Sequence, residues 1–81
     1  MKRRTDFSDL KVGDHLKRSL GGMRPAWVIV GEITGTTFRV GSLDGIIPWQ
    51  EGWTFNKETG LEIDEELGWD GKTITGSYIV E

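Results

Sequence analysis

The sequence contains no cysteine and a single histidine, His15, which rules out a disulfide framework and leaves no ligand set for a common zinc site. It also has no run of about 20 apolar residues, the length that a membrane-spanning helix requires. The chain starts with basic residues that no apolar stretch follows, so we expect no secretory signal and a cytoplasmic protein. We expect no metal, cofactor or membrane contact.

Aromatic residues supply the bulk that such a short chain needs for a core. The 81 residues, enough for one domain, include four tryptophans, three phenylalanines and one tyrosine. Each aromatic side chain can bury about 150–250 Å². We therefore expect most of them in the core, with one or two tryptophans left for a binding face.

Twelve glycines interrupt short runs of β-branched and aromatic residues, and no helical periodicity is sustained. This pattern predicts antiparallel strands. One hairpin is expected from 27–33 and 36–40, and a second from 53–55 and 61–63. In the second hairpin, Gly60 should take a positive φ that closes the turn.

The remaining segments are expected to be short. We predict strands at 15–19, 46–49, 73–75 and 77–80, a loop at 21–25 and a turn at 69–72. One-turn helices are predicted after Ser8 and at 64–68.

The chain is expected to have two parts. Residues 1–5 are expected to form a disordered basic N-terminus, and residues 6–81 the single domain. Phe7, Leu10 and Val12 are predicted to point into its core.

Three segments resemble small uncharacterised bacterial and phage proteins with an SH3-like barrel. They are the opening Leu10-Lys11-Val12-Gly13-Asp14, the hairpin at 27–40, and Phe55-Asn56-Lys57-Glu58-Thr59-Gly60-Leu61-Glu62. The resemblance, over roughly half the chain, implies a mostly β fold: a small SH3-like antiparallel barrel of five to six strands with short one-turn helices. A phage or mobile-element accessory role is implied as well, without any activity. An OB-like barrel is the alternative, although it favours a longer helix.

Catalytic chemistry lacks its usual residues. His15 is the one candidate base, and its place at the start of a β-like run is typical of a strand-edge histidine, so we expect no enzyme. The acids cluster late in the chain, at Glu62, Asp64, Glu65, Glu66 and Asp70. Without the alternating spacing of a calcium loop, they predict a solvated acidic face or a docking surface for a basic partner.

Charge is unevenly distributed along the chain. Residues 1–24 contain seven basic and three acidic residues, whereas 25–81 contain three basic and ten acidic ones. One functional hypothesis is therefore a small nucleic-acid-binding barrel that uses the basic N-terminal segment. Its contacts would be Lys2, Arg3, Arg4, Lys17 and Arg18. The acidic net charge of −3 argues against it.

The hypothesis that the sequence favours is a non-catalytic binding or regulatory module that contacts another protein. Its predicted contact residues are Trp49, Glu51, Trp53 and Trp69. Tryptophan dominates protein interfaces, and the neighbouring acids would select a basic partner. A small-ligand binder or enzyme is the third class, which a pocket with several convergent polar groups would favour.

Overall fold

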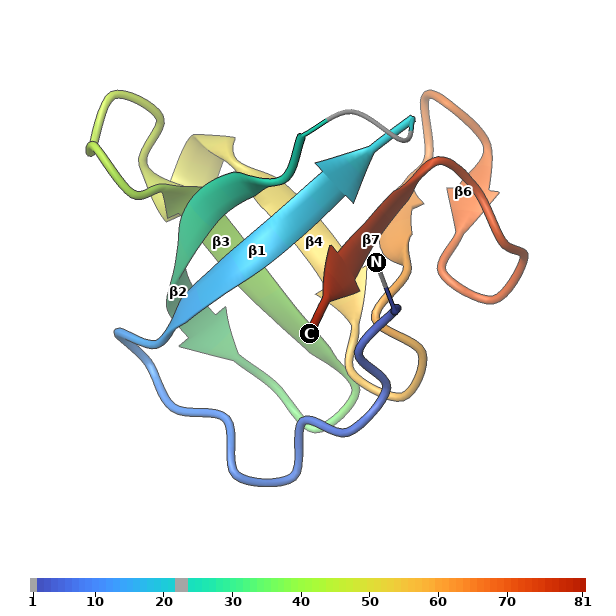
Figure 1. The fold of residues 1–81 in the computed structure, drawn as a ribbon, viewed down its shortest axis with the longest axis horizontal. Coiled ribbons are helices and arrows are strands. Elements are labelled where there is room, and N and C mark those ends of the chain that lie inside the picture. The colour runs from blue at the N-terminus through green and yellow to red at the C-terminus, as the bar shows by residue number, and fades with distance from the viewer. Residues whose placement is uncertain (1, 22–23) are drawn as a thin grey trace.

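The computed structural model describes residues 2–21 and 24–81, and this part of the chain forms seven strands and a three-residue 3₁₀ helix (Figure 1). In chain order the elements are β1 (His15–Leu20), β2 (Ala26–Ile33), β3 (Thr37–Ser42), η1 (Trp49–Glu51), β4 (Trp53–Asn56), β5 (Glu62–Asp64), β6 (Trp69–Asp70) and β7 (Ser77–Val80). The mostly β class is confirmed. The number of strands exceeds the expected five to six, and β6 forms where the sequence predicted a turn.

All seven strands belong to one antiparallel sheet with the order β6-β5-β4-β3-β2-β1-β7. The sheet curls into a half-barrel, and β7 returns beside the start of β5. There Tyr78 forms a bridge with Leu61, and the Ile79 N–H donates to the carbonyl of Gly60 at 2.9 Å. The last strand therefore contacts both β1 and the residues just before β5.

Both predicted hairpins are confirmed. β2 pairs with β3 around the turn at Thr34, whose N–H donates to the Thr37 carbonyl at 2.8 Å. β4 pairs with β5, and Gly60 between them has a φ of 74°. The register of β2 against β3 shifts between Val30 and Glu32, a β-bulge that increases the local twist of the sheet.

The core lies inside the curl. Three phenylalanine rings form its centre: Phe7 lies 4.9 Å from Phe38, and Phe38 lies 5.6 Å from Phe55, centroid to centroid. The aliphatic side chains around them are Leu16, Val28, Val30, Val40 and Ile79. Because Val28 and Val30 alternate along β2, and Phe38 and Val40 along β3, the side chains between them point to the outer face.

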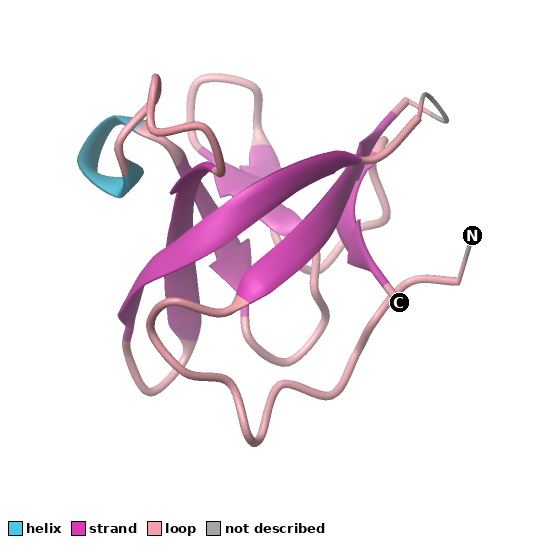
Figure 2. Cartoon of the chain, turned by 60° about the vertical axis from the view of Figure 1, so that its left-hand side comes forward, coloured by secondary structure: helices cyan, strands magenta, loops and turns pink. Residues whose placement is uncertain are grey.

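The segment before β1 runs as a loop past one end of the strands (Figures 1 and 2). The sequence predicted disorder for residues 1–5, of which residue 1 lies outside the described part. Residues 2–4 are instead held along β7: the Lys2 carbonyl accepts from the Glu81 N–H at 2.9 Å, and the Arg4 N–H donates to Ile79 at 2.8 Å. Beyond them, Phe7 is buried at the centre of the core.

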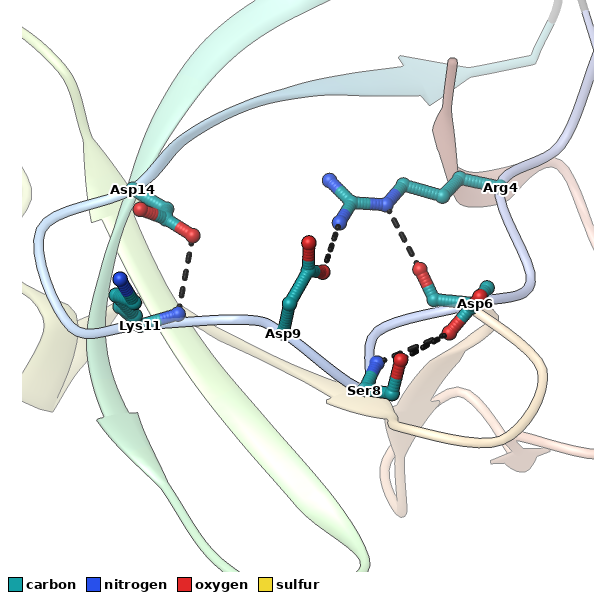
Figure 3. Close-up of polar contacts among 6 residues, drawn as sticks. All are labelled: Arg4, Asp6, Ser8, Asp9, Lys11 and Asp14. Carbon is teal, nitrogen blue, oxygen red and sulfur yellow. Dashed lines mark hydrogen bonds and ion pairs between the residues drawn. The ribbon is translucent and has the colours of Figure 1, made fainter.

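Short-range polar contacts shape the rest of this segment (Figure 3). The Arg4 guanidinium donates to the Asp6 carbonyl at 3.0 Å and lies 3.7 Å from the Asp9 carboxylate. The Asp6 carboxylate accepts from the N–H and the hydroxyl of Ser8, which lowers the pKa of Asp6. These bonds fix a turn at Ser8 and Asp9 where the sequence predicted a helical turn.

The second predicted helical turn, at 64–68, is also wrong. This segment is the turn of the β5–β6 hairpin. The Asp64 carboxylate accepts from the backbone N–H of Glu66 and Leu67, as a helix cap would, but Gly68 follows with a φ of 74° and reverses the chain. In the sequence, an acidic residue that caps a turn looks the same as one that caps a helix. The pairing of the next strand, β6, is what distinguishes the two.

The predicted loop at 21–25 includes residues 22–23, which lie outside the described part. Three other local predictions are wrong. The segment 46–49 is not a strand, because the side chains of Asp44 and Ser42 accept from the N–H groups of Ile46 and Ile47. The segment 73–75 joins β6 to β7 without strand pairing. Val12 is 64% exposed, since it occupies a turn whose next residue, Gly13, has a φ of 94°.

We predict that Gly60→Ala lowers the free energy of unfolding more than Gly68→Ala. Both glycines have a φ of 74°, so alanine costs about 1 kcal/mol in backbone strain at either position. At Gly60 the added Cβ would also overlap the Arg4 carbonyl oxygen, whereas at Gly68 it would meet no atom within 4 Å. Urea unfolding of the two variants measures the difference, and equal losses would contradict the packing of Arg4 against this turn.

Candidate functional site

The predicted tryptophan site does not form one face. Trp49 in η1 packs on the outer side of the sheet, where a Cβ at Gly31 would overlap its side chain. Arg39 lies 5.8 Å from the Trp49 ring and donates to the Gln50 carbonyl at 3.1 Å. Glu51, at the end of η1, is exposed.

The other two predicted tryptophans lie elsewhere. Trp53 in β4 turns inward and packs against the core, under the Arg18 guanidinium. Trp69 lies in β6, paired with Asp64. Trp49, Trp53 and Trp69 are all half-buried, and Trp49 and Trp53 occupy opposite faces of the sheet.

The predicted basic site is also divided. Arg3 donates to the Thr59 carbonyl at 2.7 Å, Arg4 is bound to Asp6 and Asp9, and half-buried Arg18 is paired with Glu62. Lys2 is exposed beside the C-terminal Glu81, whereas Lys17 lies on the outer face of β1. Three of the five predicted contacts are therefore used to hold the fold.

Arg18 belongs to a polar cluster at one end of the half-barrel. Its guanidinium donates to the Glu62 carboxylate at 2.7 Å, and the Ser77 hydroxyl donates to the same oxygen at 2.6 Å. The guanidinium also lies 4.5 Å from the centroid of the Trp53 ring. Glu62 is 2% exposed, so its predicted place on a solvated acidic face is wrong.

The remaining acids of the predicted acidic face do lie together in the chain, in and around the β5–β6 hairpin. Glu65 and Glu66 are exposed, and Asp64 is half-buried. Exposed Asp70 accepts from the backbone N–H of Thr73 and Lys72, which lowers its pKa. In the described part of the chain, no three His, Cys, Asp or Glu side chains gather as a metal ion would require.

The most exposed tryptophan is one that the sequence reasoning placed in a strand and did not assign to a site. Trp27 is 52% exposed on the outer face of β2. It pairs with Lys17 of β1, whose ammonium nitrogen lies 5.9 Å from its ring, and its carbonyl accepts from the Leu43 N–H at 3.3 Å. The next outward pair is His15 and Ile29. We call the surface formed by His15, Lys17, Trp27, Ile29 and Leu43 the Trp27 face.

The alternation of polar and apolar residues in β1 indicates this face. The run from Trp27 to Val30 is entirely apolar, so its composition does not distinguish an inner from an outer side. The neighbouring strand β1 does distinguish the two sides, because apolar Leu16 alternates with His15 and Lys17. The residues of β2 that pair with His15 and Lys17 must lie on the same outer side as those polar residues.

A groove of about 750 Å³ lies between the N-terminal segment, the β2–β3 and β4–β5 turns, and β6. Phe7 and Ile63 contribute apolar surface, and Lys57 and Lys72 contribute ammonium groups. Its aspartates, Asp6 and Asp70, accept hydrogen bonds from neighbouring backbone N–H groups and so stabilise their own turns. His15, the candidate base of the sequence, does not line the groove.

Comparisons with protein-family models, with curated proteins and with solved structures find no match to this chain. In the part of the chain that the structure describes, no helix has the length and apolar character needed to cross a membrane. The function is therefore argued from the geometry of the chain itself.

We predict that Arg18→Ala lowers the free energy of unfolding by about 3–5 kcal/mol, because it leaves the buried Glu62 carboxylate without its cation. The paired replacement Arg18→Met with Glu62→Leu should recover most of that loss, since no buried charge remains. Urea unfolding compares the variants. A loss below about 1 kcal/mol for Arg18→Ala would mean that the pair behaves like an exposed one.

Proposed function

We propose that this chain is a non-catalytic protein-binding module, built on an SH3-like barrel, whose contact surface is the Trp27 face. The observation that carries the proposal is the 52% exposure of Trp27 on an otherwise regular, paired strand. Tryptophan is the residue most enriched in binding hot spots, and its burial by a partner removes a large apolar area from water.

The SH3-like assignment rests on connectivity. Consecutive strands from β1 to β6 pair with their neighbours, and β7 returns to pair with β1. A one-turn 3₁₀ helix and turns connect the strands, which suits a small barrel better than the longer helix of an OB-like fold. This connectivity agrees with the sequence resemblance to SH3-like barrel proteins.

The exposed apolar residues near Trp27 support a protein partner. Leu43 is 40% exposed and is bonded to the Trp27 backbone, and Ile46 in the same connection is 79% exposed. Large side chains exposed together on one surface favour a contact with another protein. By comparison, Trp49, Trp53 and Trp69 are half-buried and dispersed.

We predict that Trp27→Ala weakens capture of the partner at least about 30-fold, equivalent to the ~2 kcal/mol of a hot spot. Because the side chain is half in solvent, the free energy of unfolding should change by about 1 kcal/mol or less. The measurement is a quantitative affinity pull-down from the native host, analysed for protein and nucleic acid. Ile74→Ala is the matched control, since Ile74 is 72% exposed in the β6–β7 connection. Equal capture by the wild type and Trp27→Ala would exclude this surface.

Nucleic acid is the second candidate, because Lys17 beside the Trp27 ring combines a cation with a stacking platform. With Arg3, Arg4 and Arg18 held by the fold, the two remaining predicted contacts, Lys2 and Lys17, give a log–log salt slope near −1.4 on single strands, compared with about −3.5 for all five. Titration of a short oligonucleotide between ~50 and ~200 mM salt measures it. No detectable binding at ~50 mM salt would remove this candidate.

A further inference from the structure

We propose that the segment bound by the Trp27 face is an acidic peptide with an apolar anchor residue. This inference rests on the proposed function and reverses the partner chemistry that the sequence predicted. The predicted contact set of Trp49, Glu51, Trp53 and Trp69 lies among acids and would select a basic partner. The exposed tryptophan, Trp27, has the Lys17 ammonium nitrogen 5.9 Å from its ring.

The cation of the Trp27 face is Lys17, and it is free to bind a partner. Lys17 stands next to Trp27 across the β1–β2 pair, and its ammonium nitrogen is 5.9 Å from the indole ring. In residues 2–21 and 24–81, the ion pairs are Arg4 with Asp9 and Arg18 with Glu62, so neither involves Lys17. Arg24 is exposed in the connection two residues before β2. A carboxylate beside Trp27 would meet positive charge on the strand and at its start.

Two exposed acids of the chain lie far from Trp27. The β5–β6 hairpin contributes Glu65 and Glu66, and in Figure 1 it lies on the other side of the sheet from β2. In sheet order, β6 is the first strand and β2 the fifth. The Lys17 ammonium beside Trp27 and the carboxylates of this hairpin are therefore separated in space. Such a charge distribution turns an approaching acidic segment toward the Trp27 face and away from the hairpin.

The loop that carries Leu43 and Ile46 also contains Asp44, whose carboxylate is already bonded. It accepts from the Ile46 N–H at 3.0 Å and from the Ser42 hydroxyl at 2.7 Å, and these bonds lower the pKa of Asp44. The same bonds fix the loop that presents Leu43 and Ile46 to solvent. Asp44 therefore shapes the apolar part of the surface.

The apolar anchor follows from the exposed side chains. Trp27, Leu43 and Ile46 are 52%, 40% and 79% exposed, respectively, and they belong to β2 and to the connection bonded to it. An aliphatic or aromatic side chain that packs on Trp27 would be desolvated together with the indole ring, while the carboxylates beside it meet Lys17. This combination of a desolvated anchor and peripheral charges is the usual arrangement of a hot spot.

The experiment is selection of displayed random 12-residue peptides on the full chain, with parallel selections on Trp27→Ala, Lys17→Glu and Lys72→Glu. Lys72 is an exposed lysine at the opposite groove and is the matched charge control. We expect wild type and Lys72→Glu to enrich peptides with several Asp or Glu residues around one large apolar residue. Lys17→Glu should lose the acidic enrichment, and Trp27→Ala should lose the apolar anchor.

Synthetic copies of two enriched peptides then give the affinities. Lys17→Glu should weaken them by about threefold to tenfold at low salt, with a smaller difference at high salt, because a partly exposed ion pair is screened. Urea unfolding of each variant confirms that the fold is intact. A 12-nucleotide oligothymidylate serves as the competing probe.

The outcomes separate the two proposals. Enriched peptides that need Trp27 but show no excess of acids would overturn the acidic partner and keep the protein-binding function. Peptides that bind Trp27→Ala as well as the wild type, or no enrichment at all, would overturn both. Tighter binding of the oligonucleotide than of any peptide would also overturn both, in favour of the nucleic-acid candidate.

Discussion

The Glu62 carboxylate links three strands that lie far apart in the sequence. One of its oxygens receives hydrogen bonds from Arg18 of β1 and from Ser77 of β7, so a single acidic group in β5 connects the beginning, the end and the late middle of the domain. A carboxylate this deeply buried is tolerated only when its partners are in place, because its hydration free energy is lost on burial and hydrogen bonds and an ion pair must compensate for that loss. The curl of the sheet and this cluster therefore depend on each other.

At the other end of the curl, an apolar contact has the corresponding role. Phe7 arrives from a segment without regular structure and fills the space beside Phe38. The N-terminal segment is held on both sides of this contact: backbone bonds to β7 precede Phe7, and the Gly13 N–H bonds to Val30 after it. The half-barrel is thus closed by polar bonds at one end and by a phenylalanine at the other, which leaves the outer face of β1 and of the first part of β2 available.

The parts of the fold that could be predicted were those determined by neighbours in the chain. The two hairpins and the positive φ of Gly60 follow from turn residues between β-forming runs. The failures concern groups whose partners are distant in sequence. Glu62 belongs to an acidic run, and only the approach of Arg18, 44 residues away, accounts for its burial. The predicted tryptophan set is divided between faces for a related reason, because the density of tryptophans along the chain does not indicate which side of a strand each one occupies.

The chain ends have a topological consequence. The bond between Lys2 and Glu81 places the first and last described residues side by side, and Arg3 forms a bridge with Val80. A short linker could therefore join the ends, and new ends could be opened at an exposed turn such as the one at Gly68, with the same strand neighbours in the folded state. Every strand would keep its place in the sheet while its position along the chain changed. The same sheet could therefore form from a circularly permuted chain, in which the strands follow one another in a different order.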